Sequence, residues 1–498
     1  MGEEYILALD QGSTTSRAIL FDRAGQVKAA AQEPLRSILP RPGWVEHDAQ
    51  ALWESAATAL NTVLQAVPEA RHRVVAMGIA NQRETVVAWD KRTGQAVAPA
   101  ISWQCRRTAD LCQTLKNRGL EAFVRQKTGL PLDPYFSATK IHWLFQEHAD
   151  LVRLAKAGRL AVGTVDSWLL FQLSGGQHLT DVSNAARTLL MNLRTLSWDQ
   201  ELLDLFEVPS AILPEIVDSA GIGVPVQGDW FSRPVPVLGI LGDQQASLFG
   251  HGCLRPGMVK STYGTGAFVL MNTGMTPVAS PEALLSTVAW RMDGVTHYAL
   301  EGSVFSSGSA VEWLRDNLKV ISDVGESEAL AQSVEDTAGV YFVPAFVGLG
   351  APYWDSYARG TVVGLTRGAQ AAHLVRAVLE ASAFQTRDIV ETMAQESGYP
   401  VTQLSVDGGM SRNRFFSQFQ ADILGVPVAV APYQELTALG AAAMAAHGLG
   451  WDVVPWMATS RASDWYRPTM EAALRDRRYR EWKKAVARAR NWAEGSGG

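Results

Sequence analysis

YILALDQGSTTSRAILFD, residues 5–22, is the stretch that decides the fold. It holds two apolar runs of strand length, Tyr5–Leu9 and Ala18–Asp22, joined by the polar turn Asp10–Arg17. The chain after it predicts a third strand, a helix and a fourth strand, over Val27–Gln32, Ala49–Val67 and Val74–Ile79. This order begins with three strands, whereas a Rossmann unit alternates strand and helix from its start. The sequence therefore predicts an α/β domain of another type.

A second strand–turn–strand unit occurs about halfway along the chain. Met258–Ser261 and Ala267–Met271 are apolar runs around the turn Thr262–Gly266. The repetition predicts two duplicated domains, residues 1–250 and 251–498, with a boundary where glycine and proline cluster. The strand order at the N-terminus is typical of ribonuclease H-like ATPases. The predicted fold class is therefore α/β, with two ribonuclease H-like (actin-like ATPase) domains facing a central cleft.

Composition and charge limit the classes of partner. The 498 residues are 47% hydrophobic and 19% charged, which is enough apolar material for two sizeable cores. A net charge of −6 gives no electrostatic reason to expect a nucleic acid or an anionic membrane. No apolar run reaches the ~18 residues of a spanning helix, and the acidic N-terminus is unlike a signal peptide. We expect a cytoplasmic protein with no nucleic-acid and no membrane partner.

The first turn has the composition of a phosphate-binding site. Gly12 lets the backbone approach a phosphate, the hydroxyl residues after it donate hydrogen bonds, and Arg17 adds a charged fork. The hydroxyl residues are Ser13, Thr14, Thr15 and Ser16. Asp10, at the end of a predicted buried strand, is placed to hold Mg²⁺ directly or through water. A plain hairpin with a polar turn explains the same residues, and the chain has no G-x-x-x-x-G-K-[ST] loop.

Two further turns follow predicted strands. Val235–Leu241 runs into Gly242 and Asp243, which puts a carboxylate at a strand end, where it can take a proton from a hydroxyl. Leu404–Gly409 ends in a glycine pair that lets a flat group such as a nucleoside approach. A helix N-cap and an ordinary strand–turn–helix connection are the simpler explanations.

A third group of residues is suited to a small polar substrate. The adjacent Arg83 and Glu84 combine a donor fork with an acceptor, which is what vicinal hydroxyls require. Trp103, Tyr135 and Phe268 are aromatic residues suited to the walls of such a site. Adjacent opposite charges are usually surface decoration, so the pair gains meaning only from its context.

These segments together resemble the FGGY family of carbohydrate kinases, in particular its members that act on glycerol. The matching segments are ALDQGSTTSRAI (8–19), PGWVEHD (42–48), NQRET (81–85), WQCRRT (103–108), GDQQASLFG (242–250), YGTGAF (263–268) and VPAFVGLGAPYWD (343–355). The resemblance extends over both halves of the chain. It implies an enzyme that moves the γ-phosphoryl group of MgATP onto glycerol, giving sn-glycerol 3-phosphate and ADP. It also implies a homo-oligomer, either a dimer or a tetramer.

The resemblance implies roles for individual residues. Asp243 is expected to be the general base and Asp10 to organise Mg²⁺. The residues expected to bind glycerol are Arg83, Glu84, Trp103, Tyr135, Asp243, Gln244 and Phe268. The residues expected to contact ATP or ADP are Ser13, Thr14, Thr15, Ser16, Arg17, Thr265, Gly308, Glu312, Gly409 and Asn413.

Some positions depart from the pattern of the relatives. Ser13 stands where many have Thr, which keeps the hydroxyl, and Glu312 stands where Gln is common, which we expect to weaken ATP binding modestly. Segment 227–234 lacks the basic loop of relatives controlled by fructose 1,6-bisphosphate. The phosphorylated His of other relatives has no counterpart, and Leu474 replaces a Glu that binds a sugar-transport regulator. We expect an enzyme without these controls.

Two other functions stay open on the sequence. Another FGGY kinase, acting on a ketopentose or gluconate, would share the phosphate turns and Asp243 but would need a longer pocket. A non-metabolic actin-like ATPase would hydrolyse ATP without any response to polyols. ADP release in the presence of different polyols distinguishes these possibilities.

Overall fold

The computed structural model describes residues 3–432, 435–459 and 464–493. Its strands are β1 Tyr5–Gln11, β2 Thr15–Asp22, β3 Val27–Pro34, β4 Glu46–His47, β5 Val74–Asn81, β6 Val86–Asp90, β7 Ala100–Ile101, β8 Leu160–Thr164, β9 Leu179–Asp181, β10 Met191–Asn192, β11 Ser197–Trp198, β12 Glu215–Val217, β13 Ala220–Pro225, β14 Pro236–Gly242, β15 Val259–Tyr263, β16 Ala267–Gly274, β17 Leu285–Met292, β18 Val295–Val304, β19 Tyr341–Val343, β20 Thr361–Val363, β21 Leu404–Asp407, β22 Val428–Val430 and β23 Asp464–Tyr466. Its α-helices are α1 Ala49–Ala66, α2 Ala70–Arg73, α3 Ala109–Asn117, α4 Glu121–Thr128, α5 Ser137–Glu147, α6 Ala149–Lys156, α7 Val165–Ser174, α8 Val182–Ala185, α9 Gln200–Leu205, α10 Asp243–Gly250, α11 Gly308–Asp316, α12 Glu326–Gln332, α13 Ala371–Ser397, α14 Arg414–Leu424, α15 Leu436–Gly448, α16 Val454–Thr459 and α17 Ala472–Ala489. Two 3₁₀ helices, η1 Ser210–Ile212 and η2 Gly409–Arg412, complete the elements of the described chain.

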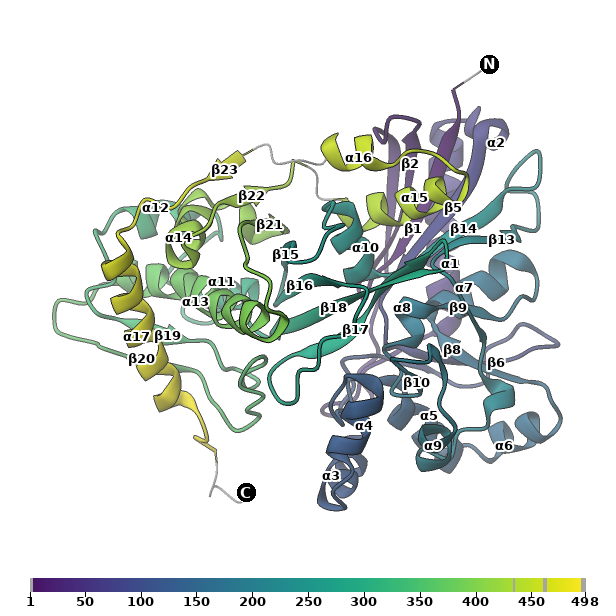
Figure 1. Ribbon diagram of the computed structural model, residues 1–498, viewed down its shortest axis with the longest axis horizontal. Coiled ribbons are helices and arrows are strands. Elements are labelled where there is room, and N and C mark those ends of the chain that lie inside the picture. The colour runs from purple at the N-terminus through teal and green to yellow at the C-terminus, as the bar shows by residue number, and fades with distance from the viewer. Residues whose placement is uncertain (1–2, 433–434, 460–463, 494–498) are drawn as a thin grey trace.

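Two large sheets form the two halves of the molecule (Figure 1). The strand order is β13-β14-β5-β1-β2-β3 in the first sheet and β17-β18-β16-β15-β21-β22-β23 in the second. Each sheet contains a hairpin, β1–β2 or β15–β16, whose first strand lies parallel to another strand, β5 or β21. A second parallel strand and an antiparallel edge strand follow in both, β14 with β13 and β22 with β23. The predicted duplication of a strand–turn–strand unit is therefore confirmed.

The predicted strands of the first sheet are present, and four of them, β1, β2, β3 and β5, are longer than expected. β1 continues to Gln11 and β5 to Asn81, and these two residues pair with each other at the end of the sheet. Their side chains are polar, so hydrophobic patterning gave no sign that the ladder continues. The extension carries the paired backbone of β1 up to the first turn.

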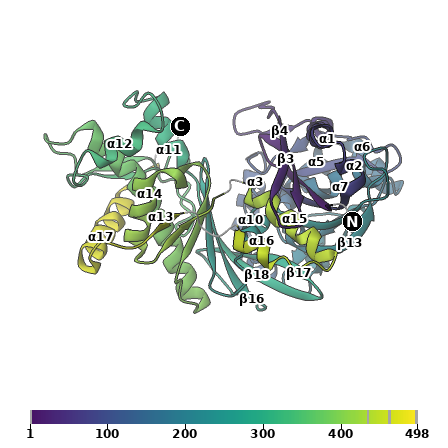
Figure 2. The same ribbon diagram turned by 90° about the horizontal axis from the view of Figure 1, so that it is seen from above.

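Helix α15 comes from the C-terminal half of the sequence but packs on the first sheet, as Figure 2 shows. It is buried and rich in alanine, and glycines of the first sheet let it approach closely. A Cβ on Gly78 would lie 2.2 Å from the carbonyl oxygen of Ala441, and a Cβ on Gly239 would lie 2.5 Å from the backbone nitrogen of Ala445. The two halves are thus tied together by more than one chain crossing.

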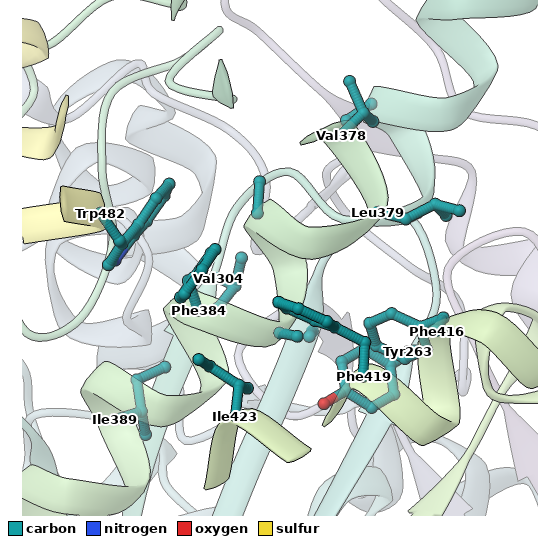
Figure 3. Close-up of a cluster of buried hydrophobic side chains, with 14 of the residues drawn as sticks. Tyr263, Val304, Val378, Leu379, Phe384, Ile389, Phe416, Phe419, Ile423 and Trp482 are labelled. Carbon is teal, nitrogen blue, oxygen red and sulfur yellow. The ribbon is translucent and has the colours of Figure 1, made fainter. Parts of the chain in front are cut away.

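The core of the second half supports the β15–β16 hairpin. Figure 3 shows Phe384 and Trp482 face to face, with ring centroids 5.3 Å apart, and Tyr263 beside Phe416. The Tyr263 hydroxyl donates to Gln420 Oε1 at 2.7 Å, so its polar end is satisfied inside the core. Tyr263 is the last residue of β15, and its anchoring fixes the start of the second turn.

None of the helices in the described part of the chain combines the length and the apolar character that crossing a membrane requires.

Candidate active site

Three parallel strands of the first sheet end side by side. The last residues of β1 and β14 both pair with Asn81, the last residue of β5. Asp10, Arg83 and Asp243 lie at or just after these strand ends, so their side chains come from the same end of the sheet. Open α/β sheets bind their ligands at the carboxyl ends of their strands.

Asp243 is the first residue of α10, and 28% of its side chain is exposed. Its Oδ1 lies 3.3 Å from Nε of Arg83. Gly242 permits this approach, since a Cβ there would lie 2.7 Å from two carbons of the Arg83 side chain. Burial raises the pKa of Asp243, and the opposing effect of Arg83 does not cancel that rise. An accessible carboxylate with a raised pKa is suited to accept a proton.

Arg83 and Glu84 belong to a cluster of four buried charges that also contains Arg187 and Glu301. Glu301 accepts from Arg83 Nη1 at 2.5 Å and from Arg83 Nη2 at 3.0 Å. Arg187 donates to Glu84 Oε1 at 2.7 Å and to Glu301 Oε1 at 3.0 Å. Burial raises the pKa of Glu301, but Arg187 and Arg83 together lower it to about 2. Arg83 and Glu84 are therefore buried and ion-paired, and they are not charges on the protein surface.

Trp103, Tyr135 and Phe268 come together beside Arg83. The Trp103 ring centroid lies 5.4 Å from that of Tyr135 and 6.5 Å from that of Phe268. The Tyr135 hydroxyl accepts from Arg83 Nη2 at 3.3 Å. Phe268 lies on β16, so both halves of the molecule contribute to this aromatic group.

A lysine from the second sheet holds Gln244. Lys260 on β15 donates to Gln244 Oε1 at 2.6 Å and to Thr262 Oγ1 at 3.0 Å. Burial lowers the pKa of Lys260 to about 8, although three nearby carboxylates favour its charged form. The Gln244 side chain is therefore oriented across the interface of the two halves, with its amide nitrogen left to donate.

Asp10 presents a second carboxylate near that of Asp243. Burial and the charge of Asp243 raise the pKa of Asp10 to about 7, against the lowering influence of Arg17, which itself pairs with Glu435 at 3.3 Å. In the described residues no hydrogen bond reaches the Asp10 carboxylate. No group of three or more His, Cys, Asp or Glu gathers as a metal site in the same part of the chain. Asp10 therefore fits a Mg²⁺ ion that takes most of its ligands from water and phosphate oxygens.

The hydroxyl residues of the first turn differ in their availability. Thr14 is exposed and Thr15 is half-buried. Ser13 Oγ accepts from Trp103 Nε1 at 2.7 Å, which ties the turn to the aromatic group. Ser16 is buried, and its hydroxyl forms hydrogen bonds of 2.9 and 2.6 Å inside the first half of the molecule. Ser16 thus differs from Thr14 and Thr15, because it is fully buried and its hydroxyl is engaged within the first half of the molecule.

Three of the residues expected to contact the nucleotide meet around the β15–β16 turn. Thr265 is exposed in this turn. Gly308 opens α11, and its N–H donates to the carbonyl of Gly264 at 3.0 Å, a contact that a Cβ would obstruct at 2.6 Å. Gly409 follows β21, the neighbour of β15, and an added Cβ there would meet nothing within 4 Å. The three residues form an open surface with little side-chain bulk.

Two other expected nucleotide residues have different surroundings. Asn413 is the N-cap of α14, where its Oδ1 accepts from the N–H of Phe416 at 3.0 Å and its Nδ2 donates to Ser327 Oγ at 3.3 Å. Glu312 is exposed on α11. Asn413 therefore uses its amide within the protein, whereas Glu312 places a negative charge toward solvent.

The sequence did not reveal Arg187, Glu301 or Lys260 as site residues. Each is a charged residue in a largely apolar segment, and a buried charge requires a partner. The isolated charge in each apolar segment was therefore the one sign in the sequence that these residues are buried and paired. The partner was not predictable from it, because Glu301 lies 218 residues from Arg83 in the sequence.

Comparisons with known protein sequences cover nearly the whole chain. Residues 5–250 match the N-terminal domain of the FGGY family of carbohydrate kinases, and residues 259–449 match its C-terminal domain. A curated relative named glycerol kinase from Caldanaerobacter subterraneus subsp. tengcongensis is 49% identical over 99% of both chains. Another, from Stenotrophomonas maltophilia, is 50% identical over 98% of both chains.

Solved structures agree with the arrangement of the two sheets. A glycerol kinase from Plasmodium falciparum, crystallised with ADP, has a TM-score of 0.92 at 34% identity and 98% coverage of both chains. A xylulose kinase from Lactobacillus acidophilus has a TM-score of 0.88 at 23% identity and 99% coverage of both chains, a likeness of fold. The predicted actin-like ATPase fold with two domains is confirmed by these neighbours. The chain therefore belongs to the FGGY family of carbohydrate kinases.

Proposed function

We propose that this enzyme transfers the γ-phosphoryl group of ATP to a terminal hydroxyl of glycerol and releases sn-glycerol 3-phosphate and ADP. The observation that carries the proposal is the position of Asp243, an accessible carboxylate 3.3 Å from Arg83 Nε. A base, hydroxyl-binding groups and apolar rings thereby meet in one place. The relatives named glycerol kinase, at 49% and 50% identity over nearly the full chain, support the same substrate.

Glycerol is bound by side chains whose orientation is fixed by other residues of the protein. Glu84 Oε1 is taken by Arg187, while no hydrogen bond to Oε2 is formed in the described residues, so Oε2 accepts from a glycerol hydroxyl. Arg83 and the amide nitrogen of Gln244 act as donors. The rings of Trp103, Tyr135 and Phe268 face the carbon chain and exclude water from it.

The transfer requires one proton to leave the attacking hydroxyl. Asp243 accepts this proton while the hydroxyl oxygen forms its bond to the γ-phosphorus. The bond from the γ-phosphorus to the bridging oxygen breaks, and its electron pair stays on ADP. The raised pKa of Asp243 makes it a stronger base than an exposed aspartate.

ATP lies between the two turns in this proposal. The residues proposed to contact it are Ser13, Thr14, Thr15, Ser16, Arg17, Thr265, Gly308, Glu312, Gly409 and Asn413. Ser16 and Asn413 would act by shaping the turns, because their side chains are engaged within the protein. Asp10 would hold Mg²⁺, which supplies positive charge to the phosphate oxygens when it is bound.

We also propose a binding role for each half of the chain. Residues 1–250 would bind mainly glycerol and carry the first phosphate turn, and residues 251–498 would bind mainly the nucleotide. Helix α15 is an exception, since it packs on the first sheet. We also propose a cytoplasmic homo-oligomer, dimeric or tetrameric, since ATP is supplied in the cytoplasm and the enzyme resembles kinases that assemble.

A panel of possible acceptors tests the substrate. ADP release is followed with MgATP alone and then with glycerol, dihydroxyacetone, D-xylulose, D-ribulose and gluconate. We expect glycerol to stimulate ADP release far above the others, with sn-glycerol 3-phosphate as the product. A faster reaction with a ketopentose or gluconate would reject the roles given to Arg83 and Glu84. A rate that responds to no polyol would favour an ATPase of the actin type.

A further inference from the structure

Two of the four buried charges, Arg187 and Glu301, have no direct part in the proposed reaction. Their side chains are fully buried, and those of Arg83 and Glu84 are 2% exposed. Buried ions lose so much hydration that they need partners in good geometry. The cluster contains equal numbers of positive and negative groups, so it is neutral overall. Neutrality accounts for its composition but not for the way in which its members are connected.

Glu301 fixes the rotation of the Arg83 guanidinium. Its two oxygens accept from Nη1 at 2.5 Å and from Nη2 at 3.0 Å, which is a bidentate contact. The Nε edge of Arg83 is thereby turned toward Asp243 Oδ1, 3.3 Å away. Glu301 lies on β18 of the second sheet, so one half of the molecule orients an arginine of the other.

Arg187 holds Glu84 in a corresponding way. Its Nε donates to Glu84 Oε1 at 2.7 Å, and its Nη2 donates to Glu301 Oε1 at 3.0 Å. Its guanidinium lies 5.4 Å from the centroid of the Phe136 ring, which limits its movement. One oxygen of Glu84 is therefore occupied by protein, and the direction of the other oxygen is set.

We propose that Glu301 and Arg187 are positioning residues, which hold Arg83 and Glu84 in the orientation that binds the polyol without touching the polyol themselves. This inference rests on the proposed function and extends it. Because Glu301 belongs to the second sheet, the polyol site is complete only when the two halves are correctly docked. Polyol binding is the property that depends on these residues, and nucleotide binding is independent of them.

Glu301→Gln tests the proposal because it keeps the size of the side chain and removes its charge and one acceptor. We expect kcat/KM for glycerol to fall ~10- to 100-fold, mainly through a higher KM, because a charge-assisted bidentate contact is lost. The KM for MgATP is expected to stay within about twofold of the wild-type value, which separates positioning from a general loss of active enzyme.

Glu380→Gln is the matched control. Glu380 is also a buried glutamate between two arginines, with Arg376 Nε at 2.9 Å and Arg478 Nη1 at 3.5 Å. It lies on α13 and contributes nothing to the polyol site. We expect this variant to unfold at a lower temperature with its glycerol KM unchanged. Arg187→Lys, which keeps the charge but loses the two-point contact, carries the same test if Glu301→Gln does not fold.

The wild-type enzyme is assayed first, so that a failure of the proposed function can be distinguished from a failure of the positioning roles of Glu301 and Arg187. If it shows no glycerol-dependent ADP release, the proposed function is wrong and this inference falls with it. If it does respond to glycerol, a wild-type glycerol KM in both Glu301→Gln and Arg187→Lys overturns the inference alone. Equal increases in the KM values for glycerol and MgATP would also overturn it, since they indicate a purely structural role.

Discussion

Trp103 connects two parts of the active site through one hydrogen bond. Its ring lies 5.4 Å from Tyr135 and 6.5 Å from Phe268, and its Nε1 donates to Ser13 Oγ at 2.7 Å. The rings belong to the proposed polyol site, whereas Ser13 belongs to the first of the two turns proposed to bind phosphate. A substitution at Trp103 is therefore expected to change kcat/KM for both glycerol and MgATP.

Trp103→Phe and Ser13→Ala should have non-additive effects on kcat/KM for MgATP. Each single variant loses the same hydrogen bond, which contributes ~0.5–1.5 kcal/mol. The double variant cannot lose that bond twice, so a cycle of the four proteins should give a coupling energy of about 1 kcal/mol. Effects that simply add would show that the bond makes no contribution to ATP use.

Lys140 is a buried lysine whose positive charge destabilises the folded state. Its Nζ donates to the carbonyls of Tyr135 at 2.6 Å and Phe136 at 2.9 Å. Burial lowers its pKa from 10.5 to about 8. Between these two values the unfolded chain keeps the proton that the folded chain has released, so raising the pH favours the folded state.

The urea midpoint of the wild type should therefore rise relative to that of Lys140→Met between pH 8 and 10.5. Other groups that titrate in this range, such as Lys260, are present in both proteins and cancel in the difference. The measurement is urea unfolding of both proteins at several pH values across this window. A difference in midpoint that stays constant would contradict the lowered pKa.

At the level of elements, helix α15 sets the position of α10, the helix that begins with Asp243. Gly440 on α15 meets α10 so closely that a Cβ would lie 1.9 Å from the carbonyl oxygen of Ala246. A further glycine, Gly250 at the end of α10, would meet the carbonyl of Leu436 at 2.1 Å if it carried a Cβ. Helix α10, which carries the proposed general base, therefore rests on a segment from the distant C-terminal part of the chain.

Gly440→Ala is expected to push the two helices apart. Backbone cannot yield as a flexible side chain does, so α10 should shift and kcat for glycerol should fall by about 10- to 100-fold, with a lower melting temperature. Gly368→Ala is the control, because its Cβ would meet only Thr366 Oγ1, at 3.8 Å. Normal activity and normal melting of Gly440→Ala would show that α15 does not position α10.

The local elements of the first sheet were predictable because their signals are local. The hydrophobic runs Tyr5–Leu9 and Ala18–Asp22 fall within β1 and β2, and the helix predicted over Ala49–Val67 is α1. The ends of β1 and β5 were not, since polar residues there continue the ladder through the pairing of Gln11 with Asn81. Hydrophobic patterning detects a strand by its buried apolar residues and therefore misses a strand end that is polar.

At the scale of the whole molecule, what the sequence conceals is long-range pairing. The grouping of Arg83, Trp103, Tyr135 and Phe268 was expected from motifs, and the structure brings these residues together. The link from Arg83 to Glu301 crosses 218 residues, and no local pattern contains it. The same holds for α15, because nothing in its buried, alanine-rich sequence indicates which of the two cores it joins.

In the proposed reaction, Asp243 takes the proton from glycerol as the γ-phosphoryl group is transferred. The most direct measurement compares glycerol-dependent ADP release by the wild type and by Asp243→Asn at saturating MgATP. Loss of the general base is expected to lower kcat ~10²- to 10⁴-fold, while the glycerol KM and the melting temperature change little, because asparagine keeps the shape of the side chain. Near-normal turnover of Asp243→Asn would show that Asp243 is not the general base, because another group would then have to accept the proton.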